Sequence, residues 1–438
     1  MPSPRQARRR HRCVSLRVRR SLLCASLGGL AGINRHKGAV GLVRWKFIAQ
    51  WAPPRCGNSV CCLGKMDGRR VLRNAVRVVV FALLLGVGET PVWSQTGAEP
   101  HVILVMTDGL RWQEVFRGAE DSLLVPKRYY NGRSVKELRG KYLAATAEER
   151  RERLMPFLWK TLIPQGQMYG DRDEHSDASV TNGFNFSYPG YSETLTGHGD
   201  PRINSNDNVP NPNVTVLEWL NKQPGLQGRV AAFGAWNVIA GIVNAGRSGF
   251  TVNAGYDPLM MTPMTPRLEL LNSLKAETPQ VWDEEPFDAP TFYMAMEYIK
   301  AKKPRVLFLS LGETDDWAHA GNYGEYLNAA NRVDRYLEQL WTTLQAMPEY
   351  AGNTTLIFLP DHGRGSGPKD WTSHGQKIPD SKYIFMGFMG PKTPAMGNRA
   401  NVPGVTQSQV AATLAKVLGL DWNAEESKAG IPVADAVW

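Results

Sequence analysis

Three apolar runs of this sequence each lead into an aspartate, and two of these aspartates have a histidine close behind. The runs are 102–107 before Asp108, 306–311 before Asp315 and His319, and 356–360 before Asp361 and His362. Short, continuously apolar runs predict strands buried on both faces, as in parallel sheets. Ligand sites in such sheets gather at the carboxyl ends of the strands. Carboxylates and imidazoles brought there are usual ligands of zinc and related ions, so the pattern predicts a metalloenzyme site built from distant segments.

The motifs differ in how strongly they indicate a metal. An aspartate after a strand, such as Asp108, is common in turns. Asp315 and His319 stand four apart and would share one face of a helical turn. In Asp361-His362-Gly363 the glycine allows a sharp turn, so both side chains can point into one site. His374 lies in a polar loop before the next apolar segment, and completes a set of histidines and carboxylates near predicted strand ends.

The net charge of +10 comes from the first 65 residues, which hold 14 of the 51 Lys and Arg residues and no Asp or Glu. Without them, 37 basic and 41 acidic residues remain, a net charge of −4. All five cysteines lie in the same stretch, so the rest of the chain can use neither a disulfide nor a thiol nucleophile. A basic arm can bind nucleic acid, but this stretch lacks apolar periodicity and paired ligand spacing. We expect no nucleic-acid binding.

Residues 66–94 have the pattern of a secretory signal peptide. Four arginines follow Met66, then comes the ten-residue apolar run Val78–Val87, then a polar, small-residue segment. The run is too short to span a bilayer. We therefore expect an exported protein, periplasmic or secreted, with membrane contact only through this segment. We interpret residues 1–65 as a mis-assigned extension upstream of the true initiator Met66; a basic disordered arm is the alternative.

Residues 95–438 predict one α/β catalytic domain with a mostly parallel central sheet flanked by helices on both faces. Apolar strands alternate with helical segments, the habit of such sheets, and the length suits one large domain. Neither an internal repeat nor a low-complexity linker divides it. We expect strands at 101–107, 229–233, 306–311, 356–359 and 383–388, helices at 147–162, 214–222 (capped by Asn213), 291–300, 324–347 and 410–418, and a long functional loop at 176–213.

The candidate site residues resemble those of the alkaline phosphatase superfamily, within it the nucleotide pyrophosphatase and type I phosphodiesterase branch. Val105-Met-Thr-Asp108-Gly-Leu-Arg111 resembles the first metal motif of that branch. Glu313-Thr-Asp315-Asp-Trp-Ala-His319 resembles its Glu-Pro-Asp-x-x-Gly-His motif, with alanine replacing the glycine. Leu359-Pro-Asp361-His362-Gly363 matches its Ser-Asp-His-Gly motif. The segment from Ser187 to Gly197 aligns with its nucleophile loop, and His374 stands where its last histidine ligand is expected.

The resemblance implies a fold like that of alkaline phosphatase and two divalent metal ions. One ion would be held by Asp315, His319 and His374. The other would be held by Asp108, Asp361 and His362, with Ser187 as a further ligand. We expect zinc, with manganese as the alternative, since both accept such donors. Coordination would favour the Ser187 alkoxide. The implied activity is hydrolysis of small-molecule phosphate monoesters or diesters through a covalent phosphoserine.

Contacts to the substrate are less fully specified. Ungapped counting places the phosphoryl-binding asparagine of the family at Asn208, with Asn204 and Asn206 as rivals. Gly190-Tyr191 replaces the Asn-His of the family, so the pocket wall differs. Ser192 and Thr194 are the competing hydroxyls. Four basic residues lie near the motifs and could bind a substrate phosphate, although surface charge is their commoner role and we leave them outside the predicted site: Arg111, Arg202, Arg364 and Lys377.

Three other readings share parts of this pattern. Sulfatases of the superfamily need a C/S-x-Pro-x-Arg sequence, but Tyr191 stands in the arginine position here. The cofactor-independent phosphoglycerate mutases use similar metal motifs with a large inserted domain, for which this chain is too short. A non-catalytic secreted metal-binding protein is the third reading, yet every ligand and nucleophile position is filled. The sequence indicates no oligomeric state.

Overall fold

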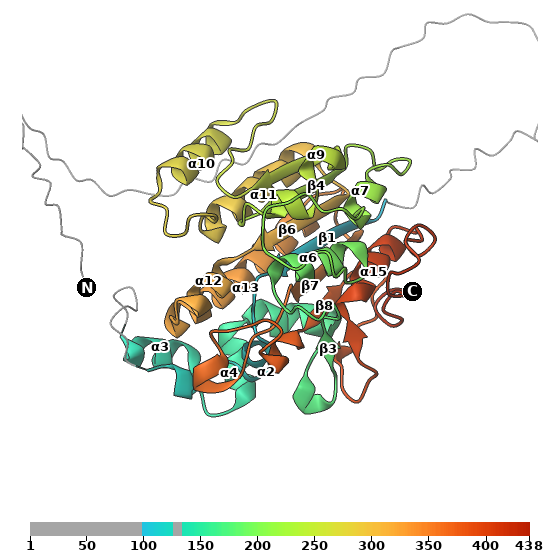
Figure 1. Cartoon of the computed structure of the whole chain (residues 1–438). Coiled ribbons are helices and arrows are strands. Elements are labelled where there is room, and N and C mark those ends of the chain that lie inside the picture. Colours follow the sequence, from blue (N-terminus) through green and yellow to red (C-terminus); the bar gives the residue numbers. More distant parts are fainter. Residues whose placement is uncertain (1–98, 126–133) are drawn as a thin grey trace, which may run out of the picture. The chain divides into compact units, whose positions relative to one another are not determined.

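The computed structural model describes residues 99–125 and 134–438, and an eight-stranded sheet lies at the centre of this part (Figure 1). Its strands, in spatial order, are β5 (Thr251–Ala254), β4 (Val230–Gly234), β6 (Val306–Leu311), β1 (His101–Thr107), β7 (Thr354–Pro360), β8 (Met386–Met389), β2 (Gln167–Tyr169) and β9 (Gly397–Asn398). Strands β5 to β7 are parallel, and β8 runs antiparallel to both neighbours. The prediction of a mostly parallel sheet is confirmed.

Helices cover both faces of the sheet because its central strands are apolar on both sides. Along β1, Ile103 and Val105 face one buried core, and Val102 and Leu104 face the other. The first core is completed by α4 (Ala147–Leu154), α11 (Asp288–Lys302) and α13 (Tyr323–Gln345). The second is completed by α6 (Ser187–Thr196), α7 (Val216–Leu220), α8 (Ile239–Ile242) and α15 (Val410–Val417).

Smaller elements complete the described part of the chain. The remaining α-helices are α2 (Trp112–Arg117), α3 (Val135–Tyr142), α5 (Ile163–Gln165), α9 (Ala245–Ser248), α10 (Pro266–Glu277), α12 (Glu313–His319) and α14 (Gly367–Asp370). Strands β3 (Ala178–Ser179) and β10 (Val405–Thr406) form a separate parallel pair. Among the described residues, no helix is long and apolar enough to cross a membrane. The predicted signal peptide and upstream extension lie outside the described residues.

Several predicted boundaries are wrong for local reasons. The helix expected at 147–162 is interrupted at Met155, which precedes Pro156 and is forced out of the helical region. Helical structure resumes at Pro156 and includes a π-helix over Leu158–Leu162. The cap of α7 is Thr215, which forms a capping box with Glu218, and not Asn213.

The segment expected to be a loop at 176–213 contains the ten-residue helix α6. The sequence did not indicate this helix because Pro189 and Gly190 both have low helix propensity. Pro189 is the third residue of α6, within the first turn, where a missing N–H removes no helical hydrogen bond. All ten residues of α6 are buried, so packing outweighs the weak intrinsic propensity.

Candidate active site

The three site strands end at the same level of the sheet. In the parallel register, Thr107 at the end of β1 pairs with Leu311 of β6 on one side and with Pro360 of β7 on the other. The segments that follow these residues therefore leave the sheet side by side. They carry Asp108, then Asp315 on α12, and then Asp361 and His362. The sheet register is thus what gathers candidate ligands separated by more than two hundred residues in sequence.

Ser187, Asp108 and His362 form a compact buried group. The Ser187 hydroxyl donates a hydrogen bond to Asp108 Oδ1 at 3.3 Å, and its oxygen also lies 3.3 Å from His362 Nε2. His362 Nε2 is 3.3 Å from Asp108 Oδ1 and 3.5 Å from Asp361 Oδ2. Atoms of Asp108, Asp361 and His362 all lie within 4.8 Å of one another, close enough to share one ion.

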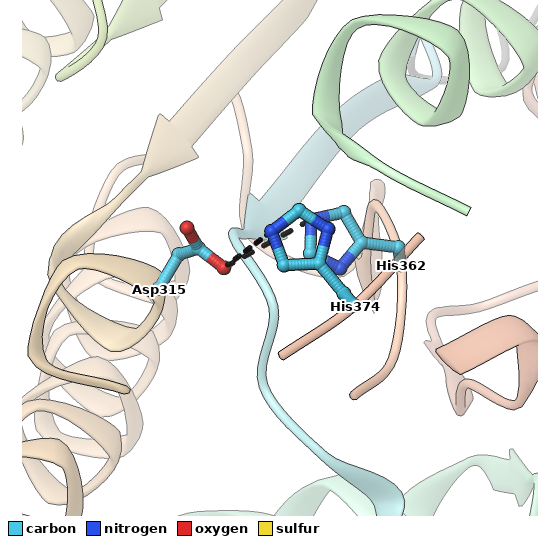
Figure 2. A group of neighbouring side chains, drawn as sticks. All are labelled: Asp315, His362 and His374. Atoms are coloured by element: carbon cyan, nitrogen blue, oxygen red, sulfur yellow. Dashed lines mark ion pairs between the residues drawn. The ribbon is translucent and has the colours of Figure 1, made fainter. Parts of the chain in front are cut away.

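A second group forms around Asp315, at the more open side of the site. Asp315 Oδ2 lies 2.9 Å from His319 Nε2, and that nitrogen lies 2.9 Å from His374 Nε2. Asp315 Oδ1 faces the Nε2 atoms of His374 and His362, at 3.7 and 3.9 Å. Figure 2 shows the rings of His362 and His374 lying one over the other beside this carboxylate; their centroids are 4.0 Å apart. His362 therefore stands between the two groups.

The donor atoms fit divalent cations. The groups whose ligand atoms lie within 4.8 Å of one another are Asp108, Asp361 and His362, and Asp315, His362 and His374, so the second contains His362 where the prediction had His319. His362 Nδ1 is 2.8 Å from the Gly363 carbonyl oxygen and His374 Nδ1 is 3.4 Å from that of Asn185, which leaves both Nε2 atoms to face the cluster. Such outer contacts commonly fix the ring of a metal-binding histidine. Asp361 Oδ2 is buried without a hydrogen-bond partner, which is costly for a carboxylate unless a cation compensates. Mixed carboxylate and imidazole donors suit zinc or manganese.

The electrostatics of the cluster also favour cation binding. Burial lowers the pKa of His374 and of His319, and the neighbouring His362 lowers both further, so both rings are neutral at pH 7. Burial and the neighbouring Asp108 raise the pKa of Asp361 to about 8. Burial alone would lower the pKa of His362, but Asp361 and Asp108 outweigh it and raise that pKa to about 9. Without a metal, a proton on His362 serves as the compensating charge.

Helix α6 packs directly against the turn after β7, which carries Asp361 and His362. A Cβ atom at Gly190 would lie 2.2 Å from the carbonyl oxygen of Asp361, so only glycine allows this approach. Ser187, the first residue of α6, is thereby held beside Asp108 and His362. Glu193 of the same helix accepts hydrogen bonds from Thr181 and Asn182, which fixes the loop leading to Ser187.

Asn206, rather than the predicted Asn208, lies beside the candidate nucleophile. Its Oδ1 accepts a hydrogen bond from the main-chain N–H of Tyr188, the residue after Ser187, at 3.0 Å. The side-chain oxygen of Asn208 instead lies over Gly241, 2.6 Å from where a Cβ atom would be. Ungapped counting could not distinguish them because both stand in one Asn-rich run. The competing hydroxyls are bonded elsewhere: Ser192 Oγ accepts from Asn211, and Thr194 donates to the Gly190 carbonyl.

The basic residues near the motifs have different environments. Arg111 is fully buried and ion-paired with Glu114, so its role is structural. Arg202 is ion-paired with Asp200 at 2.6 Å, and Lys377 is exposed. Arginine usually lies at the surface, but Arg364 is buried, and its Nη1 contacts Asp315 Oδ1. The feature of the sequence that could have indicated its place in the site is its position two residues after the predicted ligand His362.

Comparison with known proteins agrees with this architecture. Among solved structures, wild-type alkaline phosphatase PafA is 10% identical, with a TM-score of 0.51 over 78% of this chain and 99% of that chain. The 2-O GAG sulfatase BT1596 is 15% identical, with a TM-score of 0.46 over 77% of this chain and 73% of that chain. The lipoteichoic acid synthase LtaP from Listeria monocytogenes is 11% identical, with a TM-score of 0.45 over 78% and 74%. The PafA similarity shows the alkaline phosphatase-like fold. No curated protein matches the sequence.

The sequence itself identifies the family. Residues 178–423, more than half of the 438 residues, match the family described as type I phosphodiesterase / nucleotide pyrophosphatase. The matched region contains α6 with Ser187, α12, and the turn after β7. The chain therefore belongs to the type I phosphodiesterase / nucleotide pyrophosphatase family.

Proposed function

We propose that this protein is a hydrolase of small-molecule phosphate esters, chiefly diesters, that uses Ser187 as its nucleophile and binds two divalent cations. The observation that carries the proposal is the position of Ser187 Oγ, 3.3 Å from both Asp108 Oδ1 and His362 Nε2. One cation would be held by Asp108, Asp361, His362 and Ser187, and the other by Asp315, His319 and His374. Zinc is the expected ion. When bound, such cations would supply Lewis-acid activation of the hydroxyl and charge stabilisation at phosphorus.

The chain's own residues support nucleophilic attack by Ser187. Its hydroxyl donates to Asp108, so the departing proton has an acceptor beside it. Ser187 also begins the ten-residue helix α6, whose positive dipole end favours an anionic group there. Attack would form the Ser187 Oγ–P bond and break the bond from phosphorus to the leaving group, which takes up a proton and departs as the alcohol; with a diester, the intermediate keeps the second ester group. Water would then cleave the Ser187 Oγ–P bond, which releases the phosphate monoester and restores the serine hydroxyl. Asn206 would position a phosphoryl oxygen, since its oxygen is held by Tyr188 and its NH2 group is left to donate.

Preference for diesters rests on the surroundings of α6. A cavity of about 300 Å³ lies next to Tyr188, and its lining is mixed. Arg202 and Asp207 line it beside Ile203, Val209 and Pro210, and the apolar part suits a second ester group. A monoester carries additional negative charge and calls for a free cation. Arg202 is engaged with Asp200, and Arg364 is buried against Asp315. Tyr191, in the position of the sulfatase arginine, is buried and accepts a hydrogen bond from Ser310, which disfavours a sulfatase.

Substitution of Ser187 tests the proposal. Ser187→Ala should abolish turnover of a chromogenic aryl phosphate diester while the protein stays folded, because no other hydroxyl can replace the nucleophile. Ser192→Ala is the matched control on the same helix and should remain active. The same assay with the corresponding monoester should give a lower kcat/KM for the wild type. Retained turnover in Ser187→Ala, or monoester turnover exceeding diester turnover, would refute the nucleophile or the substrate class respectively.

We propose in addition that residues 95–438 form the single mature catalytic domain and that the protein is exported to the periplasm or secreted. The support is the order of charge and hydropathy in residues 66–94. Mass spectrometry of the native protein should find an N-terminus near Gln95. A native peptide from residues 1–65 would contradict the interpretation of that stretch as untranslated.

A further inference from the structure

Arg364 is a buried cation inside the candidate metal site. Its side chain has no exposed surface, and its Nη1 contacts Asp315 Oδ1. The two other nitrogens also donate hydrogen bonds: Nε donates to the Trp371 carbonyl at 3.0 Å, and Nη2 donates to the Thr372 carbonyl at 2.6 Å. The guanidinium is thus fixed by the main chain on one side and meets the carboxylate on the other. Although burial lowers the pKa of Arg364 to about 9, the group is still charged at neutral pH.

The turn that anchors Arg364 is closely packed and leads to a candidate ligand. Trp371 is only 4% exposed, and its ring packs against Tyr323 and Tyr326 of α13 with centroids 5.1 and 5.7 Å away. The main chain then reaches His374 two residues after Thr372. Arg364 therefore links the turn that carries His374 to Asp315 on α12, two segments that no strand pairing joins.

The two oxygens of Asp315 have different partners. Oδ1 contacts Arg364 and also lies 3.7 Å from His374 Nε2, whereas Oδ2 faces His319 Nε2 at 2.9 Å. A carboxylate has enough lone pairs to accept the guanidinium with one oxygen and bind a cation with the other. Space around this contact is tight, because a Cβ atom at Gly109 would lie 2.5 Å from Asp315 Oδ1 and 2.7 Å from Arg364 Nη1. The carboxylate is therefore held in one orientation.

We propose that Arg364 is a positioning residue for the metal ion of the Asp315, His319 and His374 group. It holds Asp315 Oδ1 so that Oδ2 faces His319, and it fixes the distance between α12 and the turn that carries His374. This proposal rests on the proposed two-cation function, and it assigns Arg364 to support of a ligand rather than to contact with the substrate. Lysine cannot replace it, because an ammonium lacks the planar fork that reaches both carbonyls and the carboxylate.

Metal-binding measurements on Arg364 variants test the role. Wild-type protein, Arg364→Gln and Arg364→Lys are titrated with Zn²⁺ against a chromophoric chelator, and bound zinc is counted after desalting. Wild type should retain two ions, and both variants one, with the affinity of the second lowered by about 10–100-fold, the usual effect of removing an outer-shell partner. Because this readout is metal content, a merely structural role would not produce the selective loss.

Arg399 supplies the matched control. It is also buried (8% exposed), and it bonds to Gln167, Tyr169 and Asp435, none of which belongs to the site. Arg399→Gln should lower stability and retain both ions. Two ions held with wild-type affinity in Arg364→Gln, or in Arg364→Lys if the first variant does not fold, would overturn the positioning role alone. Failure of wild-type protein to hold two ions would instead overturn the two-cation function, and the positioning role with it.

Discussion

Gly190→Ala is the substitution that most sharply tests how α6 presents Ser187. The added Cβ atom would lie 2.2 Å from the Asp361 carbonyl oxygen and 2.9 Å from its carbon. Ordinary contacts begin at 3.4 Å, so helix and turn must separate by about 1.2 Å. The carbonyl cannot yield easily, since it also accepts a hydrogen bond from the buried Gln407 at 2.8 Å. The helix must therefore move, and Ser187, three residues earlier on it, moves as well.

The expected loss follows from that displacement. Ser187 Oγ now lies 3.3 Å from His362 Nε2, and a misplacement of about 1 Å can cost about 10²-fold in rate. This corresponds to about 2.7 kcal/mol of transition-state stabilisation. Overpacking should also lower the free energy of unfolding by about 1–3 kcal/mol. The assay is kcat/KM for an aryl phosphate diester with zinc-loaded protein, together with urea unfolding.

Gly140→Ala is the control for this prediction. Gly140 lies in α3 with no atom within 4 Å of an added Cβ, so the substitution should leave activity unchanged. It should raise the free energy of unfolding by about 0.4–1 kcal/mol. A folded Gly190→Ala protein with wild-type kcat/KM would refute the argument that close packing against Asp361 positions the nucleophile.

Two further outcomes are expected. Asn206→Ala should lower kcat/KM by about 10²-fold by removing a donor to the phosphoryl group, whereas Asn208→Ala should not. If steady-state kinetics show the larger loss in Asn208→Ala, the assignment of Asn208 by ungapped counting is correct instead. Burial lowers the pKa of His101 from 6.5 to about 4, so its ring is neutral in the folded state and protonates more readily when unfolded. The free energy of unfolding of the chelator-treated protein, measured by urea unfolding, should therefore fall as the pH decreases from about 6.5 to 4. The fall should be smaller in His101→Phe. An equal fall in that variant would exclude His101 as the cause.

The sheet and its site strands were predictable because their signals are local. Continuous apolar runs indicated strands buried on both faces, and Asp361-His362-Gly363 indicated where a strand ends in a site. The spacing of apolar residues in α13 likewise predicted a helix close to its observed bounds, Tyr323–Gln345. Register was not predictable, yet it decides the geometry, since Thr107 must pair with both Leu311 and Pro360 for the candidate ligands to meet.

The parts that could not be predicted depend on tertiary packing. Helix α6 contains Pro189 and Gly190, and only burial of all its residues explains why it forms. The sequence could not show whether Asn206 or Asn208 lies beside Ser187, because this depends on the path of the loop that packs on α6. Arg364 has the composition of a surface residue, and its burial follows from the carbonyls of Trp371 and Thr372, which no local pattern reveals.

The central claim is that Ser187 attacks phosphorus, and trapping the covalent intermediate tests it most directly. Zinc-loaded protein is mixed with an aryl phosphate diester, quenched in acid during turnover, digested, and analysed by mass spectrometry. We expect an adduct on Ser187 that consists of the phosphoryl group with its remaining ester group and that is absent from a Ser187→Ala control. An adduct on another residue, or turnover without any adduct on Ser187 when the second step is made rate-limiting, would contradict it.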